Sequence, residues 1–181
     1  IYFNCVGRGS SMMYGFAPDR RGHFPEEDVA GAVALRKMFE EMYQSDFTKG
    51  KTVTADSTWK SITCHEAGKA VDGDPLTYWS AAEEKTSATL EVDLGKPVTF
   101  NVVNLQEPVF MGQRVKQYRV EYLDGTTWKP FSEGTTIGHR KLDRRTAVTA
   151  SKVRLIIEDA RAYPLISTFS LHFTSFIVKE A

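Results

Sequence analysis

The sequence predicts a mainly β protein in which a β-sandwich follows a short β–α unit. After Gly50, short segments alternate polar and apolar residues with the period of a half-buried strand, as Thr89 to Leu94 do. Turn signals such as Asp124-Gly125 separate these segments, with no helical pattern between them. We therefore expect an incomplete β–α unit over residues 1–50 and a sandwich or jelly roll over residues 51–181.

The β–α unit begins with a predicted strand and ends with a predicted helix. Residues 11–17 form a short apolar run bounded by turn residues, which is typical of a fully buried strand. The helix begins near Pro25, and the acidic residues 26–28 suit the positive end of its dipole. Its apolar face is formed by Val29, Ala32, Leu35, Phe39 and Met42.

A single β–α unit cannot stand alone, because its buried strand needs neighbours on both sides and its helix needs a sheet to cover. We therefore expect residues outside this sequence to complete it. If the sequence is expressed alone, residues 1–50 are expected to be disordered, self-associated or docked onto a companion polypeptide.

The second unit supplies the remaining strands. We expect the large rings of Trp79 and Trp128 to lie in its core, and nothing in this half resembles a catalytic constellation. Strand-like segments occur at residues 89–94, 98–105, 118–122, 128–131, 152–158 and 167–173.

Composition excludes some classes of function. Lys plus Arg and Asp plus Glu both number 23 in 181 residues, so the formal net charge is zero. This balance argues against a broad electrostatic surface for nucleic acid or membrane. No apolar run approaches the ~20 residues of a membrane span, and the N-terminus lacks a signal-peptide layout.

The loop from Lys69 to Ser80 concentrates oxygen-bearing side chains on a sharply bent backbone. Gly73 and Pro75 make the bend, and Asp72, Asp74 and Thr77 supply the oxygens that Ca²⁺ prefers. The alternative is an Asx-turn in which both aspartates accept bonds from nearby backbone N–H groups. The residues alone leave both open.

Several of these segments together resemble the discoidin-like (coagulation factor 5/8 type C) domain, a fold that many carbohydrate-binding modules also use. The resemblance implies a jelly-roll β-sandwich. It rests on Lys69–Ser80, Leu90–Pro97, Tyr118–Tyr122, Ser151–Ile157 and Ile166–His172, and it spans about residues 51 to 174.

The first unit resembles the end of the catalytic (β/α)₈ barrel of glycoside hydrolase family 29 α-L-fucosidases. Cys5–Gly22 carries this likeness, although Gly9 stands where Asn is usual and residues 12–15 replace a leucine-rich strand. Such fucosidases often continue into a discoidin-like domain. Matching stretches there are Gln106–Pro108, Gly112–Val115 and Gly134–Lys141.

The resemblance implies an exo-acting, retaining hydrolase with an aspartate nucleophile and a glutamate acid/base. Both lie earlier in the barrel, which needs ~250 residues, so we expect no catalytic residue in this sequence and no activity from it alone. Asp19, Arg20, Arg21 and His23 would lie on the rim of the active-site face, or Asp19 would pair with an arginine to fix the turn.

A structural Ca²⁺ ion, not a required cofactor, is implied at the bent loop. The residues that match the family's ligands are Lys69, Asp72, Asp74, Thr77, Ser167 and Thr168. Thr168 stands where the family has a Glu, and the loss of that carboxylate should lower the affinity. A hydrogen-bonded loop remains the alternative.

Sugar binding is implied at exposed loops, through a stacking ring and a few polar groups. The candidates are Trp59, Glu83, Arg114, His139, Arg140 and Tyr163, with a structural ion pair to Glu107 as the alternative for Arg114. The implied partners are fucosylated glycans and the remainder of the barrel, on the same or a companion polypeptide, in an extracytoplasmic location. A stand-alone carbohydrate-binding module and a purely structural module stay open as alternatives.

Overall fold

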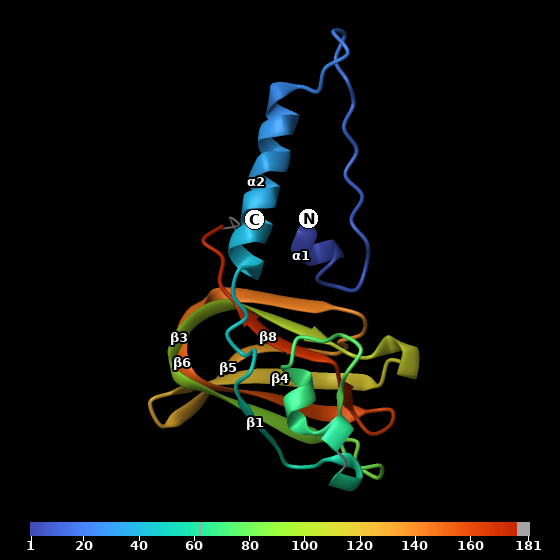
Figure 1. Cartoon of the computed structure of the whole chain (residues 1–181), viewed down its shortest axis with the longest axis vertical. Helices are drawn as coiled ribbons and strands as arrows, with labels where there is room; N and C mark the ends of the chain where they lie inside the picture. Colours follow the sequence, from blue (N-terminus) through green and yellow to red (C-terminus); the bar gives the residue numbers. More distant parts are fainter. Residues whose placement is uncertain (62, 177–181) are drawn as a thin grey trace.

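The computed structural model describes residues 1–61 and 63–176, and it contains a β-sandwich with a helical arm projecting from one end (Figure 1). The arm holds α1 (Tyr2–Cys5) and α2 (Glu26–Tyr43). The strands are β1 (Thr52–Ala55), β2 (Trp79–Ser80), β3 (Ala88–Gln106), β4 (Val115–Asp124), β5 (Thr127–Gly134), β6 (Lys141–Ala160), β7 (Leu165–Ile166) and β8 (Thr168–His172). Four 3₁₀ turns, η1 (Trp59–Ser61), η2 (Thr63–His65), η3 (Ala67–Ala70) and η4 (Val109–Met111), lie in the loops.

The strands are antiparallel, and the predicted mainly β fold is confirmed. The larger sheet has the order β1-β3-β6-β4-β5, with β8 also paired to β3, while β2 and β7 form a separate two-stranded sheet. The β3–β6 register breaks between Asp93 and Val98, where Gly95 has a φ of 76° that favours glycine. The first part of β3, before this break, pairs with β1 and β6, and the second part pairs with β6 and β8.

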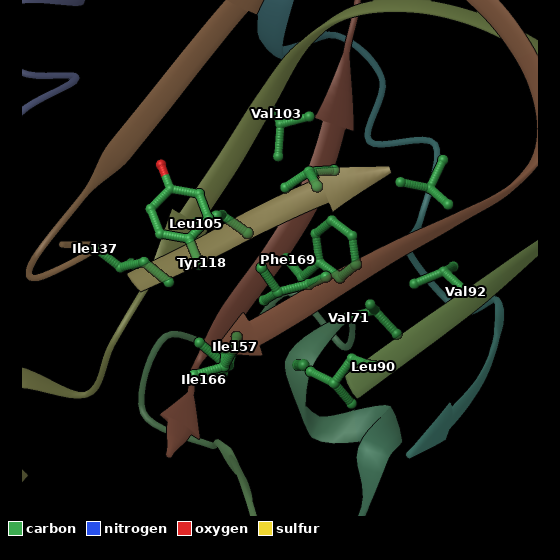
Figure 2. Close-up of a cluster of buried hydrophobic side chains, with 14 of the residues drawn as sticks. Val71, Leu90, Val92, Val103, Leu105, Tyr118, Ile137, Ile157, Ile166 and Phe169 are labelled. Carbon is green, nitrogen blue, oxygen red and sulfur yellow. The ribbon is translucent and has the colours of Figure 1, made fainter. Parts of the chain in front are cut away.

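The core of the sandwich is apolar and fully enclosed. Figure 2 shows Leu90 and Leu105 of β3 converging with Tyr118 of β4 and Phe169 of β8. Trp79 is also fully buried, as expected, and its indole N–H donates to the Ser57 carbonyl at 3.1 Å. The prediction that Trp128 lies in the core is wrong. Trp128 is only half-buried, and the Arg154 guanidinium lies 4.2 Å from its ring centroid.

The arm matches only part of its prediction. The helix begins directly after Pro25, as expected. The prediction of a buried strand at residues 11–17 is wrong, because these residues form no strand and are mostly exposed, with Met13 97% exposed. A strand needs a neighbour to accept its backbone hydrogen bonds. Within the described residues, the arm has no such neighbour over this stretch.

The base of the arm is packed onto the sandwich. Met42 of α2 is fully buried in a second small cluster with Val102 and Leu142. Further along, the Phe47 N–H donates to the Leu171 carbonyl at 3.1 Å, and the Thr48 hydroxyl donates to the Phe169 carbonyl at 2.9 Å. The division at residue 50 stays a prediction.

No helix among the described residues has the length and apolarity that a membrane crossing requires.

Candidate ligand-binding site

A small hollow with aromatic walls lies among the loops of the sandwich. Its volume is about 130 Å³, and it is lined by Trp59, His65, Tyr78, Ser80, Met111, Tyr163 and Leu165. The turn η1, which carries Trp59, is drawn in teal at the bottom of Figure 1, at the end of the sandwich away from α2.

The rings of the hollow support one another. His65 stacks on Tyr78 with centroids 4.6 Å apart, and Trp59 meets His65 edge-on at 5.6 Å. Tyr78 in turn contacts Phe110, which is 64% exposed on the neighbouring η4 turn. The buried Trp59 Nε1 finds no acceptor among the described residues. The site thus combines ring faces with polar groups, as small-ligand pockets do.

Tyr163 is held in place by Arg114. The Arg114 guanidinium lies 4.3 Å from the Tyr163 ring centroid, and its Nη1 donates to the Tyr163 carbonyl at 3.0 Å. Arg114 makes no ion pair with Glu107 in the described structure. Instead, the Glu107 carboxylate accepts the backbone N–H of Arg114 at 2.7 Å.

Glu107 is the centre of this loop architecture. Its carboxylate is 3% exposed and also accepts the backbone N–H groups of Val115 at 2.9 Å and Gly138 at 2.7 Å. A buried carboxylate with several N–H donors ties their segments together. Glu107 therefore fixes the loop that carries Met111 against the loop that follows β5.

The structure brings together only some of the predicted sugar contacts. Trp59 and Tyr163 line the hollow, and Arg114 supports Tyr163. Glu83 and His139 are exposed on other loops and do not line it. Arg140 does not line the hollow either and lies near Tyr43 at the base of the arm. Burial raises the pKa of Tyr43, and the positive charge of Arg140 opposes that rise.

Sequence reasoning missed His65, Tyr78 and Met111. A signal existed for Tyr78, because it is the first ring of the aromatic pair at Tyr78-Trp79, of which only Trp79 is enclosed by the core. His65 and Met111 lie on short 3₁₀ turns, where no periodic pattern reports which way a side chain points.

The bent loop closes on itself through hydrogen bonds. Asp72 accepts the Asp74 N–H at 2.9 Å and the Thr77 hydroxyl at 2.7 Å, and the Lys69 ammonium lies 3.6 Å from its Oδ2. Burial pushes the pKa of Asp72 upward, but these donors outweigh it and hold the pKa below its ordinary value. The charge of the carboxylate is thus already balanced.

The two other proposed Ca²⁺ ligands belong to strand pairing. The Ser167 N–H and hydroxyl both donate to the Gln106 carbonyl, at 2.9 and 3.2 Å, and Thr168 pairs with Gln106 in the β3–β8 register. Within residues 1–61 and 63–176, no three His, Cys, Asp or Glu side chains gather as metal ligands would. These contacts fit an Asx-type turn. The calcium site stays a prediction.

The turn at the tip of the arm follows the simpler interpretation. The Asp19 carboxylate accepts the Arg21 N–H at 2.8 Å and the His23 N–H at 3.2 Å, and it forms an ion pair with the Arg21 guanidinium at 2.7 Å. The Asp19–Arg21 pair therefore fixes this turn. An active-site role for Asp19, Arg20, Arg21 and His23 stays a prediction.

Residues 51–169 match the family model of the F5/8 type C domain. The chain belongs to this family. A protein of Oryza sativa subsp. japonica named as an alpha-L-fucosidase is 33% identical over 180 residues, which is 98% of this chain and 35% of that protein. The chain thus spans about a third of the length of such a relative.

Solved structures agree with both parts of the chain. A GH29 fucosidase of Ruminococcus gnavus in complex with fucose superposes with a TM-score of 0.88 and 26% identity, over 96% of this chain and 35% of that one. A chitosan-binding module from a Paenibacillus sp. IK-5 chitosanase/glucanase matches with a TM-score of 0.62 and 26% identity, over 70% of this chain and 98% of the module. The chain corresponds to the C-terminal portion of GH29 fucosidases, and the sandwich alone resembles a carbohydrate-binding module.

Proposed function

We propose that this chain is the C-terminal region of an exo-acting, retaining α-L-fucosidase that hydrolyses terminal α-L-fucosyl linkages in glycans. The observation that carries this proposal is the extent of the match. The similarity to named fucosidases covers 97–98% of the chain, so it includes the arm as well as the sandwich. A protein that shared only a sandwich would not match over the arm.

The arm supports the proposal through an uncovered apolar groove. A groove of about 690 Å³ lies beside α2, and the side chains of Met12, Phe16, Leu35 and Phe39 contribute to its walls. A helix with such a face buries it against a sheet in stable proteins. The remainder of the catalytic barrel, on the same or a companion polypeptide, is the occupant that the fucosidase relatives suggest.

Activity measurements test this proposal. The polypeptide that joins this chain to a preceding barrel is expected to release fucose from an aryl α-L-fucoside, with the α-anomer appearing first by NMR, because a retaining mechanism preserves the configuration. The 181-residue chain alone is expected to release none. Release by the isolated chain, or inversion by the longer polypeptide, contradicts the proposal.

We also propose that the sandwich binds a sugar in the hollow. Its aromatic walls offer stacking surfaces for a pyranose ring. Trp59→Ala and Tyr163→Ala are expected to lower glycan retention at least tenfold. Trp128→Ala is the matched control, because this ring lies against Arg154 and outside the hollow. Equal retention by all three variants would favour a purely structural sandwich.

Fucosylated glycans are the proposed partners, and an extracytoplasmic location follows from such substrates. Secretion of the longer polypeptide, measured by fractionation, tests the location. We also propose that the bent loop requires no Ca²⁺, because its own donors already satisfy Asp72.

A further inference from the structure

A polar cleft separates the start of the arm from the sandwich. Its volume is about 350 Å³. One wall is formed by α1 and Arg8, and the other by Glu133 of β5 and residues 141–145 of β6. This cleft adjoins the apolar groove beside α2, with which it shares Ile1 and Phe3, and it has no lining residue in common with the aromatic hollow. The functions proposed above do not involve its charged residues.

The backbone places Arg8 firmly against β6. The Leu142 N–H donates to the Gly7 carbonyl at 3.0 Å, and Arg8 forms an antiparallel bridge with Lys141. Gly7 permits this approach, because a Cβ there would lie 2.4 Å from the Phe3 carbonyl oxygen and 2.9 Å from Leu142 Cβ. The position of the Arg8 backbone is therefore built into the fold.

The cleft carries more positive charge than its own carboxylates can neutralise. Four cationic side chains line it, from Arg8, Lys141, Arg144 and Arg145, against the two carboxylates of Glu133 and Asp143.

Asp143 is already occupied. It is 6% exposed, it accepts the Tyr118 hydroxyl at 2.7 Å, and the Lys141 ammonium lies 3.7 Å away. Arg144 also has partners, since its Nη1 donates to the Phe176 carbonyl at 3.1 Å and its guanidinium lies over the Phe3 ring. Asp143 is therefore not available to balance the remaining positive charge, and Arg144 is already engaged by its own partners.

Arg8 and Arg145 are the cations left over. In the part of the chain that the structure describes, neither forms an ion pair with a carboxylate. Both lie near the Tyr118–Asp143 pair. Burial and the charge of Asp143 raise the pKa of Tyr118, while the charges of Arg145 and Arg8 oppose that rise. Both arginines line the cleft and are exposed, and among the described residues the Arg145 Nη1 donates only to the neutral Arg144 carbonyl at 3.2 Å.

We propose that this cleft binds an oxyanion, such as sulfate, phosphate or the carboxylate of an acidic sugar, between Arg8 and Arg145. The planar guanidinium presents paired donors that match the oxygens of these anions. The cleft volume lies at the lower end of the range for small-ligand sites, about 300–1,000 Å³.

Calorimetric titration of the polypeptide that carries this chain, with sodium sulfate, sodium phosphate and sodium glucuronate at constant ionic strength, tests the proposal. Arg8→Gln and Arg145→Gln are each expected to weaken binding at least tenfold. Arg161→Gln is the matched control, because this exposed arginine does not line the cleft, and it should bind like the parent. Circular dichroism checks that each variant is folded.

The pattern of affinities separates the sources of the anion. Binding of all three salts supports a general oxyanion site, and selective binding of glucuronate supports an acidic sugar. Equal affinity in all four proteins would mean a nonspecific salt effect and would overturn the proposal. An absence of binding in the parent would also overturn the proposal. It would indicate that an acidic side chain elsewhere in the longer polypeptide already fills the cleft. Neither result depends on fucosidase activity, so failure here is distinguishable from failure of the proposed function.

Discussion

The arm and the sandwich differ in how completely their apolar residues are buried. In the sandwich, Trp79, Phe100 and Phe169 are completely buried, and each strand has a hydrogen-bonded neighbour. In the arm, Met13 is 97% exposed and Val33 of α2 is 48% exposed. The sandwich is therefore a closed unit, while the arm presents surfaces that its own residues do not cover.

The difference also explains which arm element forms. A helix satisfies its backbone hydrogen bonds internally, so α2 exists without a sheet beside it. A strand has no internal partners, so residues 11–17 stay extended and unpaired in the described structure. A segment that is a strand in a larger sheet therefore needs the neighbouring strands to form its hydrogen bonds.

Core truncation gives the largest expected effect and tests this contrast directly. Phe169→Ala removes a fully buried ring and should lower the free energy of unfolding by about 3–5 kcal/mol. Met13→Ala removes a side chain of similar chemical class that is exposed, and its effect should stay within about 0.5 kcal/mol. Denaturant unfolding followed by tryptophan fluorescence measures both. Comparable losses would show that the arm shares the core.

Glu107 tests how strongly the loops of the sandwich depend on one buried carboxylate. Glu107→Gln replaces one acceptor oxygen with an N–H₂ group that faces backbone donors, so we expect a loss of about 1–3 kcal/mol. Amide exchange should speed up at Arg114 and Gly138. Glu84→Gln, on an exposed turn, is the control and should leave both readouts unchanged. Unaltered amide exchange in the Glu107 variant would show that the carboxylate does not hold these loops together.

The sequence predicted the features that local chemistry decides. Examples are the start of α2 directly after Pro25, the Asp19–Arg21 turn and the alternating strands. Each depends on residues close together in the chain. Predictions that depended on distant partners fared less well. Trp128 was expected in the core, but it is only half-buried and the Arg154 guanidinium lies over its ring.

The candidate site was only partly predictable for the same reason. Trp59 and Tyr163 were identified as potential sugar contacts, and they meet in the hollow although they lie far apart in the sequence. Their neighbour Met111 comes from the loop that the Glu107 contacts fix, and His65 is positioned by stacking on Tyr78. No periodic pattern in the sequence encodes those contacts.

His172 tests the joint between the two regions. This residue is 4% exposed, its ring bonds to the Ser170 hydroxyl and the Ser45 carbonyl at 2.9 Å, and Tyr43 of α2 lies edge-on to it. Burial lowers its pKa below the ordinary 6.5, although Asp46 opposes the shift and Arg140 reinforces it.

The sign of the pH effect follows from this shift. Because the folded protein disfavours the protonated imidazole, the contribution to stability is complete above pH 6.5 and is lost as pH falls through the folded-state pKa. Thermal unfolding between pH 7 and pH 5 should show this loss, and His172→Asn should reduce it. His139→Asn, at an exposed position, should keep it. An identical pH profile in the His172 variant would place the titrating group elsewhere.

The bent loop gives the smallest expected effect. Asp72→Asn weakens the bonds from Asp74 and Thr77 and should cost about 1 kcal/mol. Because the pKa of Asp72 is lowered in the folded protein, its contribution to the free energy of unfolding is present above about pH 4 and is lost as pH falls through the folded-state pKa. The difference in free energy of unfolding between the variant and the parent should therefore shrink in acid. Because Lys69 already balances the carboxylate, adding EDTA or millimolar Ca²⁺ should leave the melting temperature of the parent unchanged. A rise in melting temperature with Ca²⁺ that disappears in Asp72→Asn would instead establish a metal site, and the loop would then depend on an ion that the closed core of the sandwich does not need.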